Sequence, residues 1–178
     1  MTFLSRLLGT QRDPREKWRP LWHRLVGAAR EEHWYAKRGA ADTLDGRFDM
    51  ISMLTALFML RLEAEPEGVP AAARLTELFV EDMEGQMREA GIGDPTVGKL
   101  MGRMMATLGG RAGTLRDALA REDDAELAGV VRRNMHLSDE ENGPDAMAQG
   151  LRALHARLGR GGENVRALAR REARPNRA

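Results

Sequence analysis

The sequence predicts an all-α protein, a single compact helical domain of about six or seven helices with basic terminal arms. Apolar residues recur at three- and four-residue steps through most of the 178 residues, and no stretch shows the convincing alternation of a strand. Asp13-Pro14 and Asp94-Pro95 each have the form of a helix cap followed by a first-turn proline. The apolar content of 42% suffices for one modest core, and the lack of Cys excludes disulfides and thiolate metal sites.

The first expected elements lie before residue 40. A helix opening at Asp13-Pro14 carries an apolar stripe to Ala29, and Pro20 inside this stripe either kinks the helix or marks a later start. Gly39, after two basic residues, predicts a helix end. Residues 1–12 are expected to form an N-terminal amphipathic arm, more typical of a docked terminus than of a membrane anchor, with these residues on one side: Phe3, Leu4, Leu7 and Leu8.

The longest apolar stretch, Phe48 to Leu62, predicts a central helix that is nearly surrounded by protein. It follows the segment "DTLDGRFDM", in which Thr43 or Asp45 can cap the helix. A loop is expected from Pro66 to Pro70, and then a helix from Pro70 to Ala90 with an acidic outer face. Its inward residues are predicted to be Leu75, Leu78, Phe79, Met83 and Met87.

The second half continues with helices that start at Asp94-Pro95 and, after the polar break "SDEENGPD", near Met147. Gly109-Gly110 is expected to bend or end the first of these helices. The Gly- and Arg-rich tail is expected to be disordered. The predicted organisation is therefore an arm over residues 1–12, a helical domain over 13–159 and a basic tail over 160–178.

Charge is unevenly distributed along the chain. Residues 1–38 hold 9 basic and 4 acidic groups, and residues 160–178 hold 6 and 2. With a net charge of +1 overall, the body over 39–159 carries 1 − 5 − 4 = −8. The basic arms suit attraction to anionic lipid or to ribosomal RNA. The sequence predicts no secretory signal, and its longest apolar stretch falls short of the roughly 20 residues of a membrane span.

The sequence contains no spacing of residues that is typical of a catalytic or metal-binding site. His23, His33, His136 and His155 lack zinc or di-iron spacing, and no nucleotide-binding motif is convincing. The carboxylates of "EDMEGQMRE" could bind a hard cation, but such a run on a helix is more typical of a solvated face. We therefore expect no enzyme activity, no metal and no cofactor.

Arg47 stands among three aspartates of the opening segment, Asp42, Asp45 and Asp49. We expect a partly buried Arg47, held by Asp42 and by Asp45 or Asp49, that orients the loop before the central helix. Gly46 is expected where backbone approaches too closely for a side chain. Two alternatives stay open: a carboxylate site for catalysis, or residues that face solvent and contact a partner directly.

Two blocks of sequence resemble the ubiquinol–cytochrome c chaperone family. They are Tyr35 with "KRGAADTLDGRFDMISMLTALFMLRL", and "LFVEDMEGQMREAGIGDPTVGKLMGRMM" followed by a Gly-Arg pair; the likeness runs from about Trp34 to Leu119. The sequence departs from the family pattern at Gln86-Met87, at Leu108-Gly109 and at Thr55. The matching positions, which the resemblance marks as client-binding or structural, are Tyr35, Asp42, Thr43, Asp45, Gly46, Arg47, Phe48, Asp82, Met83, Arg88, Glu89, Gly91, Gly93, Asp94, Val97, Lys99, Met104, Gly110 and Arg111.

The resemblance implies a non-enzymatic, all-α assembly chaperone that binds newly made cytochrome b during biogenesis of the respiratory ubiquinol–cytochrome c reductase. It also implies a ribosome contact and a small protein partner. The charges suit a bacterial cytoplasmic protein at the anionic surface of the inner membrane. The alternative is a membrane-surface or ribosome-associated helical adaptor with a different client. Methionines at helical spacing are expected in the core rather than in a client groove: Met50, Met53, Met101 and Met104.

Overall fold

The structure, a computed structural model, describes residues 13–160 and confirms the predicted all-α class. The predicted arm over 1–12 and nearly all of the tail over 160–178 lie outside the described residues. Within the described part the elements are η1 (Glu16–Trp18), α2 (Arg19–Ala29), α3 (Glu32–Ala36), α4 (Leu44–Glu63), η2 (Pro66–Gly68), α5 (Val69–Glu89), α6 (Asp94–Leu119), α7 (Ala125–Asn134) and α8 (Gly143–Arg160), where η is a 3-10 helix.

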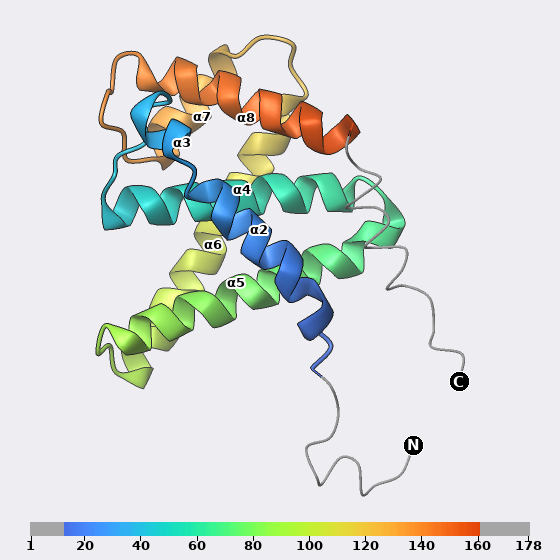
Figure 1. Ribbon diagram of the computed structural model, residues 1–178, viewed down its shortest axis with the longest axis vertical. Helices are drawn as coiled ribbons and strands as arrows, with labels where there is room; N and C mark the ends of the chain where they lie inside the picture. Colours follow the sequence, from blue (N-terminus) through green and yellow to red (C-terminus); the bar gives the residue numbers. More distant parts are fainter. Residues whose placement is uncertain (1–12, 161–178) are drawn as a thin grey trace, which may run out of the picture.

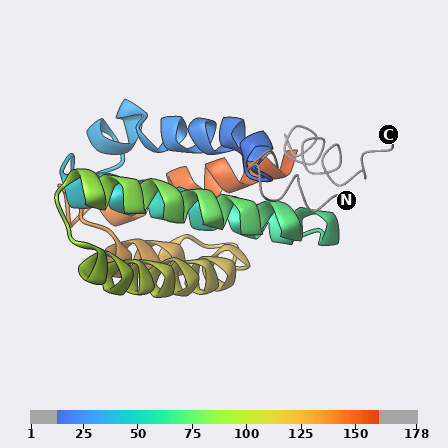
Figure 2. The same cartoon turned by 90° about the horizontal axis from the view of Figure 1, so that it is seen from below.

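Helix α4 is the centre of the molecule, as its apolar sequence predicts. Helices α2 and α3 lie on one side of it and α6 and α7 on the other, while α5 and α8 flank it in the middle layer (Figures 1 and 2). Met50 and Met53 are fully buried within it, and Met101 of α6 is also buried, which confirms their place in the core. Among residues 13–160, no helix is long and apolar enough to cross a membrane.

The N-terminal helix is shorter than the sequence predicts. The chain after Asp13-Pro14 forms only the turn of η1, and α2 begins at Arg19 with Pro20 in its first turn. Pro20 therefore marks a later start, because its fixed φ and missing N–H suit the first turn of a helix. The chain then turns at Arg30 and Glu31 before the short helix α3. Trp34 and Tyr35 fasten α3 to α2 by donating hydrogen bonds of 2.8 Å to the carbonyls of Ala28 and Ala29.

Helix α6 corrects a second expectation. Gly109-Gly110 does not end it, since the helix runs without interruption from Asp94 to Leu119. Buried residues on both sides of the glycines, Leu108 and Leu115, anchor one face of α6 in the core. Packing of this face outweighs the weak helix propensity of glycine, about 1 kcal/mol per residue relative to alanine.

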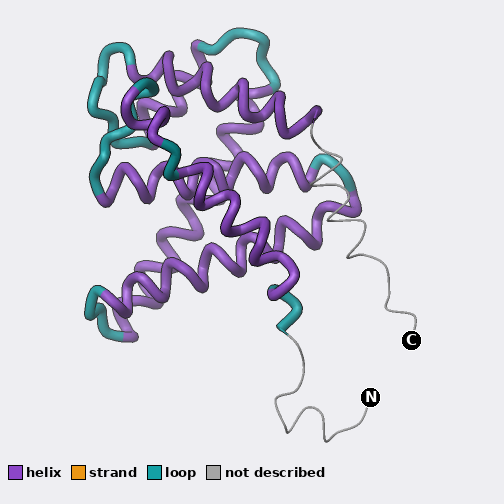
Figure 3. The backbone as a smooth tube through the Cα atoms, viewed as in Figure 1, coloured by secondary structure: helices purple, strands orange, loops and turns teal. Residues whose placement is uncertain are grey.

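Two loops that are distant in sequence meet beside the start of α4 (Figure 3). Ala40 and Leu137 form an isolated antiparallel bridge, in which the Ala41 N–H donates to the His136 carbonyl at 3.0 Å and the Ser138 N–H donates to the Gly39 carbonyl at 2.9 Å. Gly39 has a φ of +82°, and a Cβ there would lie 2.6 Å from the Gly143 backbone. Glycine is therefore required at this junction.

Candidate functional site

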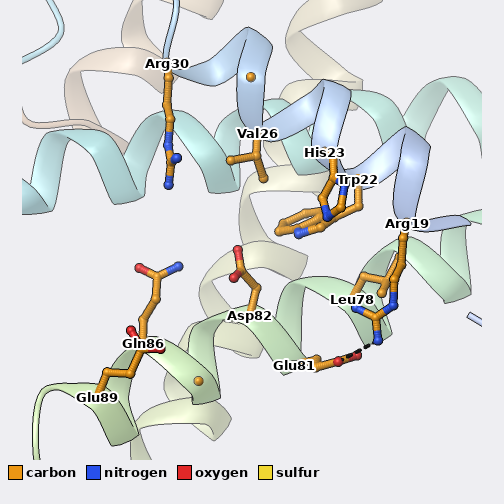
Figure 4. Close-up of a pocket in the computed structure, with 12 residues that line it drawn as sticks. Arg19, Trp22, His23, Val26, Arg30, Leu78, Glu81, Asp82, Gln86 and Glu89 are labelled. Carbon is orange, nitrogen blue, oxygen red and sulfur yellow. Dashed lines mark hydrogen bonds and ion pairs between the residues drawn. The ribbon is translucent and has the colours of Figure 1, made fainter. Parts of the chain in front are cut away.

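A groove with two adjoining hollows runs between the α2–α3 segment and helices α4 and α5; we call it the α2–α5 groove. The first hollow, of about 520 Å³, lies between α2 and α5 (Figure 4). Trp22, Val26 and Leu78 supply its apolar surface, and an ion pair between Arg19 and Glu81 closes one end. The other residues that line it are His23, Gly27, Arg30, Asp82, Gly85, Gln86 and Glu89.

The second hollow, of about 610 Å³, continues the groove past Arg30 and Gln86, which line both hollows. Residues of both resembling blocks meet here, since Tyr35 and Phe48 of the first face Met83 of the second. The full lining is Arg30, Glu32, Tyr35, Asp42, Leu44, Arg47, Phe48, Ile51, Met83 and Gln86. The groove therefore brings together seven of the predicted site residues: Tyr35, Asp42, Arg47, Phe48, Asp82, Met83 and Glu89.

The groove combines an apolar floor with an acidic excess at its rim. Glu81 is paired with Arg15 at 2.9 Å and with Arg19 at 2.7 Å. Three further carboxylates, Asp82, Glu89 and Glu32, form no ion pair with any described residue. Such a surface suits an apolar segment that carries basic residues.

A large apolar side chain also stands at the edge of the second hollow. Leu44, the first residue of α4, is 82% exposed. An exposed leucine beside an apolar hollow adds to a surface that another chain can cover, whereas a scattered exposed leucine needs no explanation.

Arg47 corrects the expectation of a partly buried arginine. Its Nε donates to Asp42 Oδ1 at 2.7 Å, as predicted, but the side chains of Arg47 and Asp42 are 60% and 61% exposed. Asp49 does not join this pair, because it is buried and bonds elsewhere. Arg47 and Asp42 thus form an exposed ion pair at the rim of the second hollow.

The start of α4 holds three further predicted residues. Thr43 is the N-cap, and its Oγ1 accepts a hydrogen bond of 3.1 Å from the Gly46 N–H. Asp45 lies exposed in the first turn, where a carboxylate favours the helix dipole. A Cβ on Gly46 would lie 2.0 Å from the Ala41 carbonyl oxygen, which confirms the predicted close approach of backbone.

Among residues 13–159, Arg111 is the one arginine that is buried. Its side chain is 6% exposed, and its Nη2 lies 2.5 Å from Asp49 Oδ1, whose side chain is 5% exposed. It also donates hydrogen bonds to the Ser52 hydroxyl and to the Asn134 carbonyl. The other oxygen of Asp49 accepts from the His136 N–H at 2.9 Å. The buried ion pair thus joins α4 to α6, and a hydrogen bond from Arg111 ties both to the end of α7.

His136 completes this buried cluster from the solvent side. Its Nδ1 lies 2.7 Å from Asp49 Oδ2, although the imidazole side chain is 66% exposed. The hydrogen bond to the Asp49 carboxylate, together with its negative charge, raises the pKa of His136 above the usual value. In the groove, burial raises the pKa of the Tyr35 hydroxyl, whose role is to donate to the Ala29 carbonyl.

The remaining predicted residues lie outside the groove. An ion pair between Arg88 and Asp94 spans the turn from α5 to α6, where Gly91 has a φ of +80° and Gly93 caps α6. The others lie along α6, with Val97 buried, Met104 half-buried, and Lys99 and Gly110 exposed. These positions shape a turn and a helix and do not line the groove.

Sequence reasoning missed several residues. The sequence makes Asp49 one of two candidate second partners of Arg47, and nothing local to Asp49 points to Arg111, which is 62 residues away. His136 has no recognisable spacing to Asp49, so only the folded chain shows their contact. Within the groove, Arg30, Leu44 and Gln86 belong to no motif. The sequence signal that could have found Leu44 is a large apolar residue directly after a predicted helix cap, Thr43.

The fold is all-α, and its groove combines apolar and charged residues from two motif blocks, as a surface that binds another chain does. The described residues hold no group of three or more His, Cys, Asp or Glu that could bind a metal ion. The family described as "Ubiquinol-cytochrome C chaperone" matches residues 36–172, and the chain belongs to this family of non-enzymatic chaperones. Its structure is similar to the crystal structure of the Cbp3 homolog from Brucella abortus, with a TM-score of 0.62 and 28% identity over 80% of this chain and 83% of that one. No curated protein gives a significant sequence match.

Proposed function

We propose that this chaperone binds newly made cytochrome b and so supports assembly of the ubiquinol–cytochrome c reductase. The observation that carries the proposal is that the family match spans residues 36–172, while residues of both motif blocks line one groove. Cytochrome b is a membrane protein, and the cytoplasmic loops of such proteins are rich in Lys and Arg. An apolar groove whose carboxylates Asp82, Glu89 and Glu32 pair with no described residue suits such segments.

Deletion of the gene in its host tests the client. We expect loss of the haem b absorbance and of ubiquinol–cytochrome c reductase activity, both restored by the intact gene. Normal haem b and normal activity after deletion would rule out cytochrome b as the client.

Two exposed apolar residues allow the groove itself to be tested. Leu44→Ser changes a residue that is 82% exposed at the groove, and Val69→Ser changes one that is 51% exposed outside it. Neither substitution should lower the melting temperature by much, because little apolar area is lost from the core. We expect Leu44→Ser to complement the deletion poorly and Val69→Ser to complement it fully. If both variants complement the deletion equally well, the client binds a surface other than the groove.

A further inference from the structure

We propose that His136 acts as a proton-sensitive latch on the loop before α4, and that this latch sets the rim of the second hollow of the α2–α5 groove. The latch is the set of contacts that His136 makes with Ala41 and Asp49. Its effect on client binding rests on the proposed function, whereas the latch itself is a property of the folded chain that can be measured without a client.

His136 fastens the loop before α4 and α4 itself at two points. Its N–H donates to Asp49 Oδ2 at 2.9 Å, and its Nδ1 lies 2.7 Å from the same oxygen. Its carbonyl accepts a hydrogen bond of 3.0 Å from the Ala41 N–H. The imidazole is nevertheless largely exposed, so it can exchange protons with solvent while these contacts are in place.

Ala41 connects the latch to the groove. Its carbonyl oxygen lies so close to α4 that a Cβ on Gly46 would be 2.0 Å from it. The next residue, Asp42, lines the second hollow and pairs with Arg47 at 2.7 Å. Ala41 is thus held between His136 and the first turn of α4, and a change in its position also moves Asp42 and the exposed ion pair at the rim.

The charges on the protein side of His136 favour its protonated form. The hydrogen bond to Asp49 and the charge of this carboxylate raise the pKa of His136, and Asp45 of α4 adds to the rise. Burial and the positive charge of Arg111 on α6 oppose it. The net direction is upward, which brings the titration of His136 closer to neutral pH than that of an ordinary histidine.

The groups on the solvent side of the ring offset one another. Arg132 of α7 and Glu140 of the α7–α8 loop line a hollow of about 270 Å³ together with His136, and they carry opposite charges. The contact to Asp49 therefore decides the response to protonation. A neutral imidazole can still donate from Nδ1, so deprotonation removes the positive charge and keeps the hydrogen bond. The latch is then loosened without being lost.

The direction of the response follows from the raised pKa. The contribution of the charge is fully present below the unfolded pKa of about 6.5 and is lost as the pH rises through the folded-state pKa. We therefore expect the loop before α4 to open locally more often at pH 9 than at pH 6.

Amide hydrogen exchange of the full chain, corrected for the intrinsic rate at each pH, tests the latch. The Ala41 and Ser138 amides, which donate to the carbonyls of His136 and Gly39, report local opening. The amide of Leu54, in the buried middle of α4, reports opening of the whole domain. From pH 6 to pH 9, protection of Ala41 and Ser138 relative to Leu54 should fall by about two- to fivefold, the range for one largely exposed ion pair.

The matched variant is His136→Asn, because its amide can donate to Asp49 from the position of Nδ1 but does not titrate. The ratio of protection should then be the same at pH 6 and pH 9. Melting temperatures at both pH values verify folding, and His136→Gln replaces His136→Asn if the latter unfolds the protein.

A fluorescent label at the rim tests the second step, since the chain contains no Cys of its own. Leu44→Cys, at the second hollow, takes an environment-sensitive label, and Val69→Cys, exposed outside the groove, is the control. Emission from position 44 should titrate with a midpoint above about pH 6.5, and emission from position 69 should stay constant. His136→Asn should abolish the titration, whereas His23→Gln, in the first hollow, should leave it unchanged.

Three results would each overturn the proposal. They are a ratio of Ala41 to Leu54 protection that does not change with pH, a change that persists in His136→Asn, and a label at position 44 that does not titrate although the loop opens. Deletion of the gene tests the client separately, so failure of the latch and failure of the proposed function give different results.

Discussion

Arg111 and Arg47 show how burial decides the value of an ion pair. Removing one member of a buried pair leaves an uncompensated charge and costs about 3–5 kcal/mol, whereas an exposed pair contributes about 0–1 kcal/mol. The side chains of Arg111 and Asp49 are 6% and 5% exposed, and those of Arg47 and Asp42 are 60% and 61% exposed. The stability of the domain therefore depends on Arg111.

Substitution of each arginine measures how much its ion pair contributes to the free energy of unfolding. Arg111→Ala should lower the free energy of unfolding by about 3–5 kcal/mol, and Arg111→Lys should recover only part of it, because a lysine cannot reproduce the several directed contacts of a guanidinium. Arg47→Ala should cost at most about 1 kcal/mol. Denaturant unfolding of the three variants measures this order, and a larger loss for Arg47→Ala would contradict it.

His136 makes stability depend on pH. The Asp49 carboxylate raises the pKa of His136 in the folded protein above the unfolded value of about 6.5. Its contribution is then fully present below about pH 6.5 and is lost as the pH rises through the folded-state pKa. His136→Gln should therefore lower the melting temperature more at pH 6 than at pH 9. A difference between wild type and variant that stays the same at both pH values would show that the imidazolium contributes nothing.

At the scale of the elements, two helical glycines that each precede an arginine, Gly46 and Gly102, should affect stability in opposite ways when they are replaced by alanine. Gly46→Ala should destabilise the protein, since its Cβ would lie 2.0 Å from the Ala41 carbonyl oxygen. Gly102→Ala should stabilise it by about 0.5–1 kcal/mol, because this mid-helix position has open space. Thermal unfolding should move in opposite directions for the two variants, and a shift of the same sign would contradict the assignment.

The all-α class and the order of the helices could be predicted from local sequence patterns. The contacts between residues of different helices could not. The stripe of α4 and the Asp-Pro start of α6 could be predicted, because periodicity and caps act within a few residues. Gly109-Gly110 could not be judged, since the buried face of α6 decides its continuity. Likewise the motif residues of the site are visible in sequence, but their separation into a groove, a buried cluster and a turn depends on contacts between distant segments.

At the scale of the whole molecule, the acidic body and basic ends predict a salt-dependent association with anionic membranes. Each basic residue near such a surface contributes about 1 kcal/mol, and salt screens this attraction. Flotation of the protein with anionic liposomes should succeed at low salt and fail at high salt, and replacing the six arginines of residues 160–178 by Gln should weaken it. If these replacements leave binding unchanged, the tail does not contribute to membrane association.

The bridge between Ala40 and Leu137 has a consequence for biosynthesis. The start of α4 is secured by the His136 N–H and carbonyl, yet α4 leaves the ribosome some ninety residues earlier than they do. During this interval Asp49 lacks both contacts from His136, and until α6 is made it also lacks Arg111, which is 62 residues away. The face of α4 that α8 covers is also open. We expect a chain arrested before Met135 to be protease-sensitive throughout, including its N-terminal helices, and resistance to arise only once the end of α7 is made.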